Sequence, residues 1–263
     1  MDVHKFRELV WQKGRGLYRD MPWRDEPTFY YVLVSEVMLQ QTQVTRVLVK
    51  FTEFIEEFPT IEDLAAASLA DVLRVWQGLG YNRRAKYLHE AAKQIVSQGQ
   101  PANLDALTQL PGIGRNTAAA MMNYVYEVPT AYVETNIRTV MFHHFFANST
   151  NVIDKEVLEM VDKTIEHESP REWFWALMDY GSDLKSKGYG RLDVSKHYKK
   201  QAPLKGSIRE VRGKIIALLA QGRVSETTLL EQAGGDDRYS RAIEGLLADG
   251  LITRNEHGFD LTK

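Results

Sequence analysis

A short segment of the chain carries two groups that together could hold a phosphate and supply a catalytic carboxylate. Gly112 and Gly114 flank one apolar residue, which favours a tight turn between two helices. Exposed N–H groups at the start of the second helix are suited to binding a phosphate. Glu134 follows twenty residues after the second glycine and adds the carboxylate. A Gly-x-Gly pair alone also marks an ordinary helix cap, so its surroundings must decide.

The residues on either side place this turn between helices. Apolar positions recur at helical spacing over Leu104–Leu110 and again over Asn116–Tyr126, so we expect a helix on each side. Gly112 and Gly114 then lie at a helix-hairpin-helix junction. Glu134 has a second interpretation, because an acid also suits the first turn of a helix for electrostatic reasons.

A second carboxylate, Glu36, lies in an otherwise apolar helical stretch from Val32 to Val44. An arbitrary glutamate is usually exposed on a helix surface, but these neighbours favour partial burial. Burial raises the pKa of a carboxyl group and lets it deliver a proton. Two carboxylates in different environments suit a bond cleavage that needs both a general acid and a stabilising anion.

The composition is that of an ordinary folded protein of 263 residues, with 44% hydrophobic and 26% charged residues. The sequence has no apolar run of membrane-spanning length and no secretory apolar core, so we expect an intracellular protein without membrane contact. A formal net charge of −2 means that contact with nucleic acid must come from local patches. The absence of cysteine excludes disulfides, thiolate zinc sites and cysteine-ligated iron–sulfur clusters.

The most basic stretch runs from Lys185 to Lys200, with six lysine or arginine residues against one acid. It is either a solvated loop or a phosphate-binding one. Helical periodicity dominates up to about residue 180, which predicts a mostly α protein, and residues 188–206 are typical of an extended basic connection.

The last part of the chain, residues 207–263, has a different pattern. Its periodicity predicts a helix over Ile208–Leu219, a second capped by Ser225 and a third capped by Asp236 or Asp237, followed by a hairpin around residues 255–258. Three helices and a hairpin favour a winged-helix-like domain. Eight lysine or arginine residues against nine aspartate or glutamate residues leave DNA contact, protein contact and a structural role open.

Several motifs in a fixed order resemble one family. The segment Leu110-Pro111-Gly112-Ile113-Gly114 is similar to the hairpin of the helix-hairpin-helix (HhH-GPD) DNA glycosylases. Pro22-Trp23-Arg24, the block from Ser35 to Val44, Gly78-Leu79-Gly80-Tyr81 and Met178-Asp179-Tyr180-Gly181 resemble the MutY family of adenine DNA glycosylases over roughly residues 5 to 182.

The resemblance implies a two-domain glycosylase fold. Residues 28–132 are expected to form a six-helix barrel domain with the hairpin motif, and residues 1–27 with 133–206 a second helical domain. It also implies double-stranded DNA with a mismatched or damaged base as partner, and a monovalent cation is often held at such a hairpin, here by Gly112 and Gly114. The residues implied to contact DNA are Gln41 and Tyr81 as intercalating residues, Leu110, Gly112, Ile113, Gly114 and Arg115 at the hairpin, and Lys185 and Lys187 in the basic stretch.

The same resemblance assigns catalytic roles. Glu36 matches the residue that protonates adenine, and Glu134 stands where the family ordinarily has an aspartate that stabilises the sugar cation. Tyr126 and Asn136 match residues that support the catalytic carboxylate. Lyase relatives carry a Schiff-base lysine where this chain has Asn116, so a monofunctional glycosylase is implied.

Two further departures set this chain apart from the family pattern. The family usually has four cysteines after Met-Asp-x-Gly, whereas Lys185 and its neighbours follow here, so we expect no iron–sulfur cluster and a basic loop in its place. The tail is too short for a Nudix-like domain, and contact with DNA, contact with a protein partner and a purely structural role all stay open for it. The resulting hypothesis is removal of adenine opposite guanine or 8-oxoguanine. A glycosylase for thymine, uracil or a damaged base, and a catalytically impaired mismatch-binding protein, are the alternatives.

Overall fold

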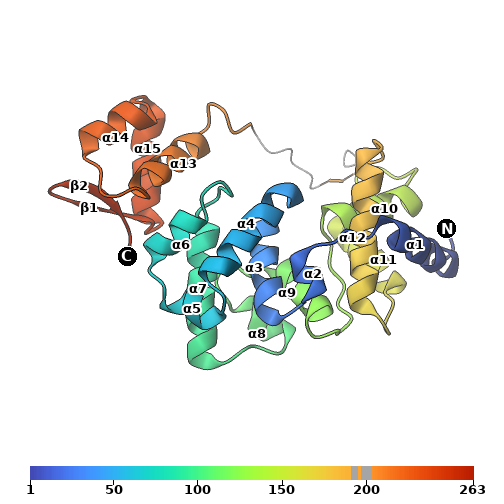
Figure 1. The fold of residues 1–263 in the computed structure, drawn as a ribbon. Coiled ribbons are helices and arrows are strands. Elements are labelled where there is room, and N and C mark those ends of the chain that lie inside the picture. Colours follow the sequence, from blue (N-terminus) through green and yellow to red (C-terminus); the bar gives the residue numbers. More distant parts are fainter. Residues whose placement is uncertain (191–194, 197–202) are drawn as a thin grey trace. The chain divides into compact units, whose positions relative to one another are not determined.

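The computed structural model describes residues 1–190, 195–196 and 203–263, and it is mostly helical (Figure 1). The prediction of a mostly α protein is therefore confirmed. Two compact units are formed by residues 1–33, 102–109 and 113–200, and by residues 34–101, 110–112 and 201–263. This division does not test the domain boundaries expected from the sequence, which stay a prediction. In the described part of the chain, no helix is long and apolar enough to cross a membrane.

The first unit is organised around α12, whose neighbours include α1, α9 and α10. Phe6, Trp173 and Phe174 are fully buried in its core. The rings of Phe6 and Trp173 meet edge to face, with 6.1 Å between their centroids. The helices of this unit are α1 (Val3–Leu17), α2 (Pro22–Asp25), α8 (Leu104–Thr108), α9 (Arg115–Tyr124), α10 (Thr135–His144), α11 (Asp154–Thr164) and α12 (Pro170–Ser186).

A buried ion-pair network connects two of the sequence motifs within this unit. The Asp179 carboxylate accepts hydrogen bonds from Arg24 at 2.7 and 3.0 Å and from the Arg19 side chain at 2.6 Å. Arg24 also lies over the Trp175 ring, 5.2 Å from its centroid. Because a buried charge needs such partners, the Pro-Trp-Arg and Met-Asp-x-Gly motifs contribute mainly to holding α2 against α12.

The second unit contains a helical part and the tail. α3 (Phe29–Leu39) begins in the first unit and ends in the second, where α5 and α6 pack against α7, and α4 packs against α6. Phe51, Phe54 and Trp76 are buried there. The other helices of this part are α4 (Val44–Glu57), α5 (Ile61–Ala66), α6 (Leu69–Val75) and α7 (Arg83–Gln98).

The tail forms the elements that its sequence predicts. Ser225 accepts from the N–H of Thr228 as the N-cap of α14, and Asp236 caps α15 in the same way. The hairpin pairs Ile252 with Leu261 in antiparallel register. The elements are α13 (Ile208–Leu219), α14 (Glu226–Ala233), α15 (Asp237–Ala248), β1 (Ile252–Asn255) and β2 (Gly258–Leu261). The likeness to a winged helix remains an interpretation.

Three predicted helices are shorter than their periodicity indicated. The helix expected over Leu104–Leu110 ends at Thr108. The stretch Val32–Val44 is not one helix, since α3 ends at Leu39 and α4 starts after a turn. The helix expected over Asn116–Tyr126 ends at Tyr124, so Tyr126 lies in the following turn. Arg84, described below, binds carbonyls at the end of α3, and the Arg171 Nε donates to the Tyr124 carbonyl at the end of α9, where apolar spacing alone would continue each helix.

Candidate functional site

The hairpin between α8 and α9 needs glycine at one position for steric reasons. Gly112 has φ of 74°, and a Cβ added there would lie 2.8 Å from the Tyr87 Cβ. Its carbonyl accepts a hydrogen bond from the Gln40 Nε2 at 3.3 Å. Leu110 and Ile113 are buried, so their side chains anchor the hairpin and only their backbone is available to a ligand.

Gly114 has a different role from Gly112. It is the N-cap of α9 with an ordinary φ of −82°, and in the described part of the chain no side chain caps this helix. A Cβ at Gly114 would meet no heavy atom of the described residues within 4 Å. The start of α9, at the exposed Gly114 and Arg115, therefore has room for a ligand, as an anion-binding helix terminus requires.

Asn116 connects this helix to the segment that precedes α10. Its side-chain amide donates to the Val133 carbonyl at 2.7 Å. Val133 is the residue before Glu134, so one hydrogen bond ties the first turn of α9 to the backbone that carries the predicted carboxylate.

Glu134 is the N-cap of α10, the residue just before the helix. The sequence had suggested a position in the first turn of that helix. Its Oε1 accepts from the N–H groups of Asn136 at 2.6 Å and Ile137 at 3.3 Å. The residue is half-buried. Burial raises the pKa of the Glu134 carboxyl, while the N–H groups and the Lys185 charge act in the opposite direction. The longer glutamate side chain thus curls back onto its own helix.

Three of the predicted site residues come together at this helix terminus. The Lys185 Nζ donates to the Asn136 Oδ1 at 3.4 Å, and Asn136 donates its N–H to Glu134. Lys185 belongs to the last turn of α12 and not to a loop. Lys187 follows the end of α12 and pairs with Asp183 at 2.8 Å. The predicted contacts of Arg191, Lys199 and Lys200 fall outside the described residues.

Tyr126 lies in the turn after α9 and is half-buried. Its ring centroid is 6.5 Å from that of Phe29, the first residue of α3. Its predicted support of the catalytic carboxylate stays a prediction.

Glu36 lies on α3 in the second unit, half-buried between the fully buried Ser35 and Val37. The carboxyl end of this helix is fixed by Arg84, whose Nη1 donates to the carbonyls of Val37 and Met38 at 2.8 Å each. The predicted general acid is therefore placed on a helix whose end is anchored by a buried guanidinium.

Arg84 lies in the basic segment after Tyr81, where such residues usually face solvent or phosphate, but the structure buries it. Its side chain is buried, and desolvation lowers its pKa to about 10. Its Nη2 donates to Thr42 Oγ1 at 3.0 Å and to the carbonyls of Leu79 and Gly80 at 3.1 and 3.0 Å. Five such acceptors on two separate segments could not be foreseen from a run of basic residues.

The two predicted intercalating residues share an uncommon backbone conformation. Gln41 has φ of 57° and Tyr81 φ of 49°, both in the left-handed region that disfavours side chains larger than glycine. Both lie next to segments that Arg84 holds. Strained residues kept in place by their surroundings cluster at functional sites.

The cations next to Tyr81 contact the tail. The Lys86 Nζ donates to the Asp249 carbonyl at 2.8 Å, and Arg83 lies 3.6 Å from the Asp249 carboxylate. Arg209 of α13 hydrogen-bonds the Tyr81 hydroxyl and lies over its ring at 5.3 Å. These contacts within the second unit give the tail a packing role next to a predicted DNA contact.

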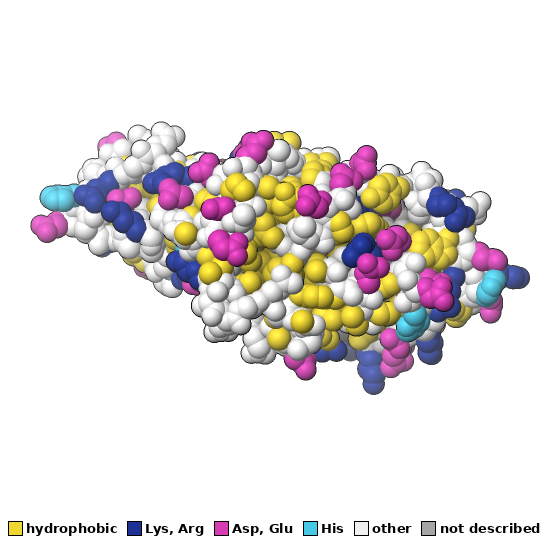
Figure 2. All heavy atoms as spheres, turned by 60° about the horizontal axis from the view of Figure 1, so that its bottom comes forward, with side chains coloured by type: hydrophobic (Ala, Val, Ile, Leu, Met, Phe, Trp, Pro, Cys, Tyr) yellow, Lys and Arg dark blue, Asp and Glu magenta, His cyan; other side chains and the backbone are white. Residues whose placement is uncertain are grey.

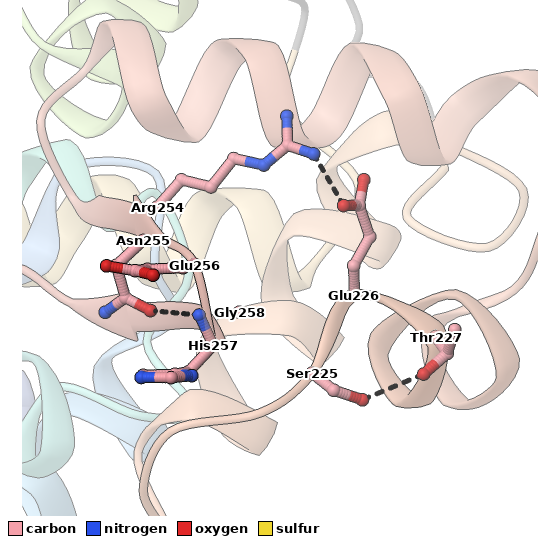
Figure 3. Close-up of a pocket in the computed structure, with 8 residues that line it drawn as sticks. All are labelled: Ser225, Glu226, Thr227, Arg254, Asn255, Glu256, His257 and Gly258. Carbon is pink, nitrogen blue, oxygen red and sulfur yellow. Dashed lines mark hydrogen bonds and ion pairs between the residues drawn. The ribbon is translucent and has the colours of Figure 1, made fainter.

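A pocket in the tail lies between the β1–β2 hairpin and the start of α14 (Figure 3). Arg254 pairs there with Glu226 at 2.6 Å, and Asn255 Oδ1 accepts from the His257 N–H at 2.9 Å. The pocket contains none of the predicted catalytic residues. Figure 2 shows acidic and basic side chains interspersed over the face drawn there, consistent with the net charge of −2.

The described side chains show whether this chain could hold the iron–sulfur cluster that the family usually carries. Among residues 1–190, 195–196 and 203–263, no group of three or more histidine, cysteine, aspartate or glutamate side chains is placed to hold a metal ion. The chain has no cysteine, and the ammonium of Lys185 extends from the end of α12. Without a thiolate, and with an ammonium at this place, the chain does not fit a thiolate-ligated iron–sulfur cluster.

The fold and the hairpin define a helix-hairpin-helix protein with a carboxylate at a neighbouring helix terminus. Residues 34–165 match the family described as HhH-GPD superfamily base excision DNA repair protein. The chain therefore belongs to the HhH-GPD superfamily of base excision DNA repair proteins.

Similar sequences include proteins named adenine DNA glycosylase. The one from Mycolicibacterium smegmatis is 34% identical, over 91% of this chain and 90% of that protein. The one from Mycobacterium tuberculosis is 32% identical, over 95% of this chain and 90% of that protein. The mouse protein is 30% identical, over 87% of this chain and 47% of its own length.

Solved structures share the fold at lower identity. A thermostable thymine-DNA glycosylase has a TM-score of 0.60 and 24% identity, covering 68% of this chain and 88% of that chain. An endonuclease III in a non-covalent DNA complex has a TM-score of 0.56 and 18% identity, covering 68% and 85%. The predicted glycosylase fold is thereby confirmed.

Proposed function

We propose that this protein is a monofunctional DNA glycosylase that removes mispaired adenine from double-stranded DNA. The observation that carries this proposal is the arrangement of Glu134. Its carboxylate is held at the α10 terminus beside Asn136 and Lys185, and Asn116 ties its backbone to the open N-terminus of α9. The similarity to adenine DNA glycosylases over most of the chain supports adenine as the base.

The hairpin is proposed to hold the DNA backbone while the adenine nucleotide leaves the stack. A phosphate would accept hydrogen bonds from the first N–H groups of α9 next to Gly114 and Arg115. Gln41 would fill the gap and Tyr81 would wedge between bases, because their strained backbone presents them at tight turns. Arg115 and Lys187 would add phosphate contacts.

Excision then needs both carboxylates. Glu36 is proposed to protonate adenine at N7, so that the electron pair of the N-glycosidic bond leaves with a neutral base. Glu134, as an anion, stabilises the positive charge that develops on the sugar. Water adds to C1′ and loses a proton, which completes hydrolysis. Tyr126 and Asn136 are proposed to orient the Glu134 side of the site.

Because Asn116 stands where lyase relatives carry a lysine, we propose that the protein has no lyase activity. The Asn116 amide cannot form a Schiff base, and in this structure it donates to the Val133 carbonyl. We further propose that the protein works without an iron–sulfur cluster. The fixed end of α12 would then carry the basic residues nearest the site.

Single-turnover assays test the function. Duplexes with A opposite G, A opposite 8-oxoguanine, T opposite G and U opposite G are incubated with the protein and then treated with alkali to reveal abasic sites. We expect alkali-labile product from the adenine duplexes only, and no strand cleavage before alkali. Product from pyrimidines alone would contradict the adenine assignment, and binding without product would support a mismatch-binding protein.

The replacement Glu134→Asp tests how the site uses its unusual acid. Shortening the side chain by one methylene moves the carboxylate by about 1 Å, which can cost about a hundredfold in rate. We expect the single-turnover rate to fall, because Asn136 and Lys185 are arranged around the glutamate. A faster variant would show that glutamate limits the reaction.

A further inference from the structure

Lys185 is connected to the predicted catalytic carboxylate by a short chain of polar contacts. Its ammonium donates to the Asn136 Oδ1 at 3.4 Å, and the Asn136 N–H donates to the Glu134 Oε1 at 2.6 Å. The Lys185 charge also lowers the pKa of the Glu134 carboxyl through space. A lysine expected to contact phosphate therefore belongs to the surroundings of the acid.

Backbone packing sets the position of this lysine. A Cβ at Gly181 of α12 would lie 2.2 Å from the Asn136 carbonyl oxygen, so the two helices touch here through their main chains. Lys185 follows Gly181 by four residues and thus lies one turn further along the same face of α12. A helix in close contact, and not a loop, presents the ammonium.

Several charged side chains on the described parts of the neighbouring elements form ion pairs. Burial raises the pKa of Glu134, and Lys185 is the charged side chain that lowers it. Among the described residues, the ion pairs made by α10, α12 and the adjoining loops are Arg138 with Asp154, Lys187 with Asp183, Arg171 with Glu127, and Asp179 with Arg19 and Arg24. Arg115 begins α9 and is exposed.

We propose that Lys185 is a positioning residue for catalysis, which holds Asn136 and keeps the Glu134 carboxylate ionised. This inference rests on the proposed function, because it concerns the same site. A carboxylate that stabilises a sugar cation must carry its charge, and partial burial works against that charge. The ammonium offsets part of this cost without touching the substrate.

The decisive variant is Lys185→Gln, because glutamine keeps an N–H donor for Asn136 but removes the charge. Without the charge the pKa of Glu134 rises, so a smaller fraction is ionised at low pH. The single-turnover rate at saturating DNA should then fall by about two- to fivefold on the acidic side of the profile. It should match the wild type at alkaline pH, so that the acidic limb moves to higher pH.

Two controls separate charge at the site from charge in general. Lys163→Gln removes one exposed lysine from α11 of the same unit and should leave the acidic limb in place. Lys185→Arg keeps the charge and should restore the wild-type profile. An unchanged profile in Lys185→Gln, with only weaker and less salt-dependent DNA binding, would show a phosphate contact instead and overturn the proposal.

A titration without DNA keeps this test independent of activity. The carboxyl signals of ¹³C-labelled glutamate are followed against pH, and Glu134 is assigned by its loss in Glu134→Gln. We expect the pKa of Glu134 to be higher in Lys185→Gln than in the wild type or Lys163→Gln, and equal values would overturn the inference. If the wild-type protein excises no base, the proposed function is contradicted, but the effect of Lys185 on the pKa of Glu134 is not. Circular dichroism confirms that each variant is folded.

Discussion

Two helices of the first unit begin close together in the chain, but their N-termini are capped differently. α9 starts after Gly114, and among the described residues no side chain caps it. α10 starts after Glu134, whose carboxylate accepts from two N–H groups. Each terminus offers the same partial positive charge. Among the described residues, the α9 terminus has no side-chain cap, and the α10 terminus is capped by a carboxylate of the protein itself.

Under the proposed function, the same partial charge at a helix start would serve phosphate binding at α9 and catalysis at α10. An open terminus attracts a phosphate, because the first N–H groups of a helix have no acceptor within the helix itself. A filled terminus fixes a carboxylate in one orientation, which is useful when that carboxylate must face a developing charge. The hydrogen bond from Asn116 to the Val133 carbonyl joins the two termini. The predictions below change one terminus at a time.

The largest effect is expected from Glu134→Gln, which removes the charge at the filled terminus but keeps an oxygen that can accept the same N–H groups. The single-turnover rate should fall by about 10²- to 10³-fold, with DNA affinity little changed. Glu168→Gln, at an exposed position, serves as the control. A variant with normal excision would show that the filled terminus is a structural cap only.

Gly181→Ala should loosen the filled terminus by separating α10 from α12. The new Cβ would lie 2.2 Å from the Asn136 carbonyl oxygen, so the helices must move apart. Overpacking of this kind lowers the free energy of unfolding by about 1–3 kcal/mol, as urea denaturation would measure. Gly16→Ala on α1, where the Cβ meets no heavy atom of the described residues within 4 Å, should be neutral or stabilising. Equal effects of the two replacements would contradict the close packing.

Gly114→Asp would convert the open terminus into a filled one. The φ of −82° and the open space at this position accept a side chain, and an aspartate there can cap α9. DNA affinity should fall by about tenfold, because the added charge occupies the phosphate position. Gly114→Ala adds a methyl group without charge and should have a smaller effect. Unchanged affinity of the aspartate variant in fluorescence anisotropy would exclude this terminus from binding.

Asn116→Ala would break the link between the termini. One hydrogen bond of about 0.5–1.5 kcal/mol is lost, so the excision rate at saturating DNA should fall by about two- to tenfold. Arg115→Ala, one residue earlier, should weaken binding and leave that rate unchanged. If Asn116→Ala also changes only the affinity, the link does not position Glu134.

The smallest effect concerns the pH dependence of stability. Burial raises the pKa of Glu134 in the folded protein, so folding favours its protonated form and this contribution is lost as the pH rises. Glu134→Gln should therefore have a Tm a few degrees higher than the wild type at neutral pH. The difference should vanish at acidic pH, where Glu134 is protonated. A variant that is less stable at neutral pH would show that the charged cap outweighs its burial.

The sequence predicts those parts of the molecule that depend on local chemistry. The tail is the best example, since Ser225 and Asp236 cap the predicted helices and the hairpin follows. Gly112 likewise predicts its turn, because few residues other than glycine adopt a positive φ. The motifs that contain Glu36, Glu134 and the hairpin predicted the protein family.

Long-range contacts account for what the sequence did not predict. The end of α3 at Leu39 depends on Arg84, more than forty residues later in the chain. Lys185 was assigned to a loop, yet the approach of Gly181 to Asn136 brings its helix to the acid. No local spacing encodes either contact. The cap formed by Glu134 was nearer to prediction, because an acid before a helix is a recognised signal.

The buried position of Arg84 has a consequence for how this protein can vary. Its guanidinium closes the carboxyl end of α3 with a side chain from α7, in place of the glycine that commonly ends a helix. The spacing between Glu36 and Gln41 is thereby set by a fork of fixed shape, which lysine cannot imitate. Insertions between these two residues should be rare among relatives that keep this arginine, even though the turn itself lies at the surface.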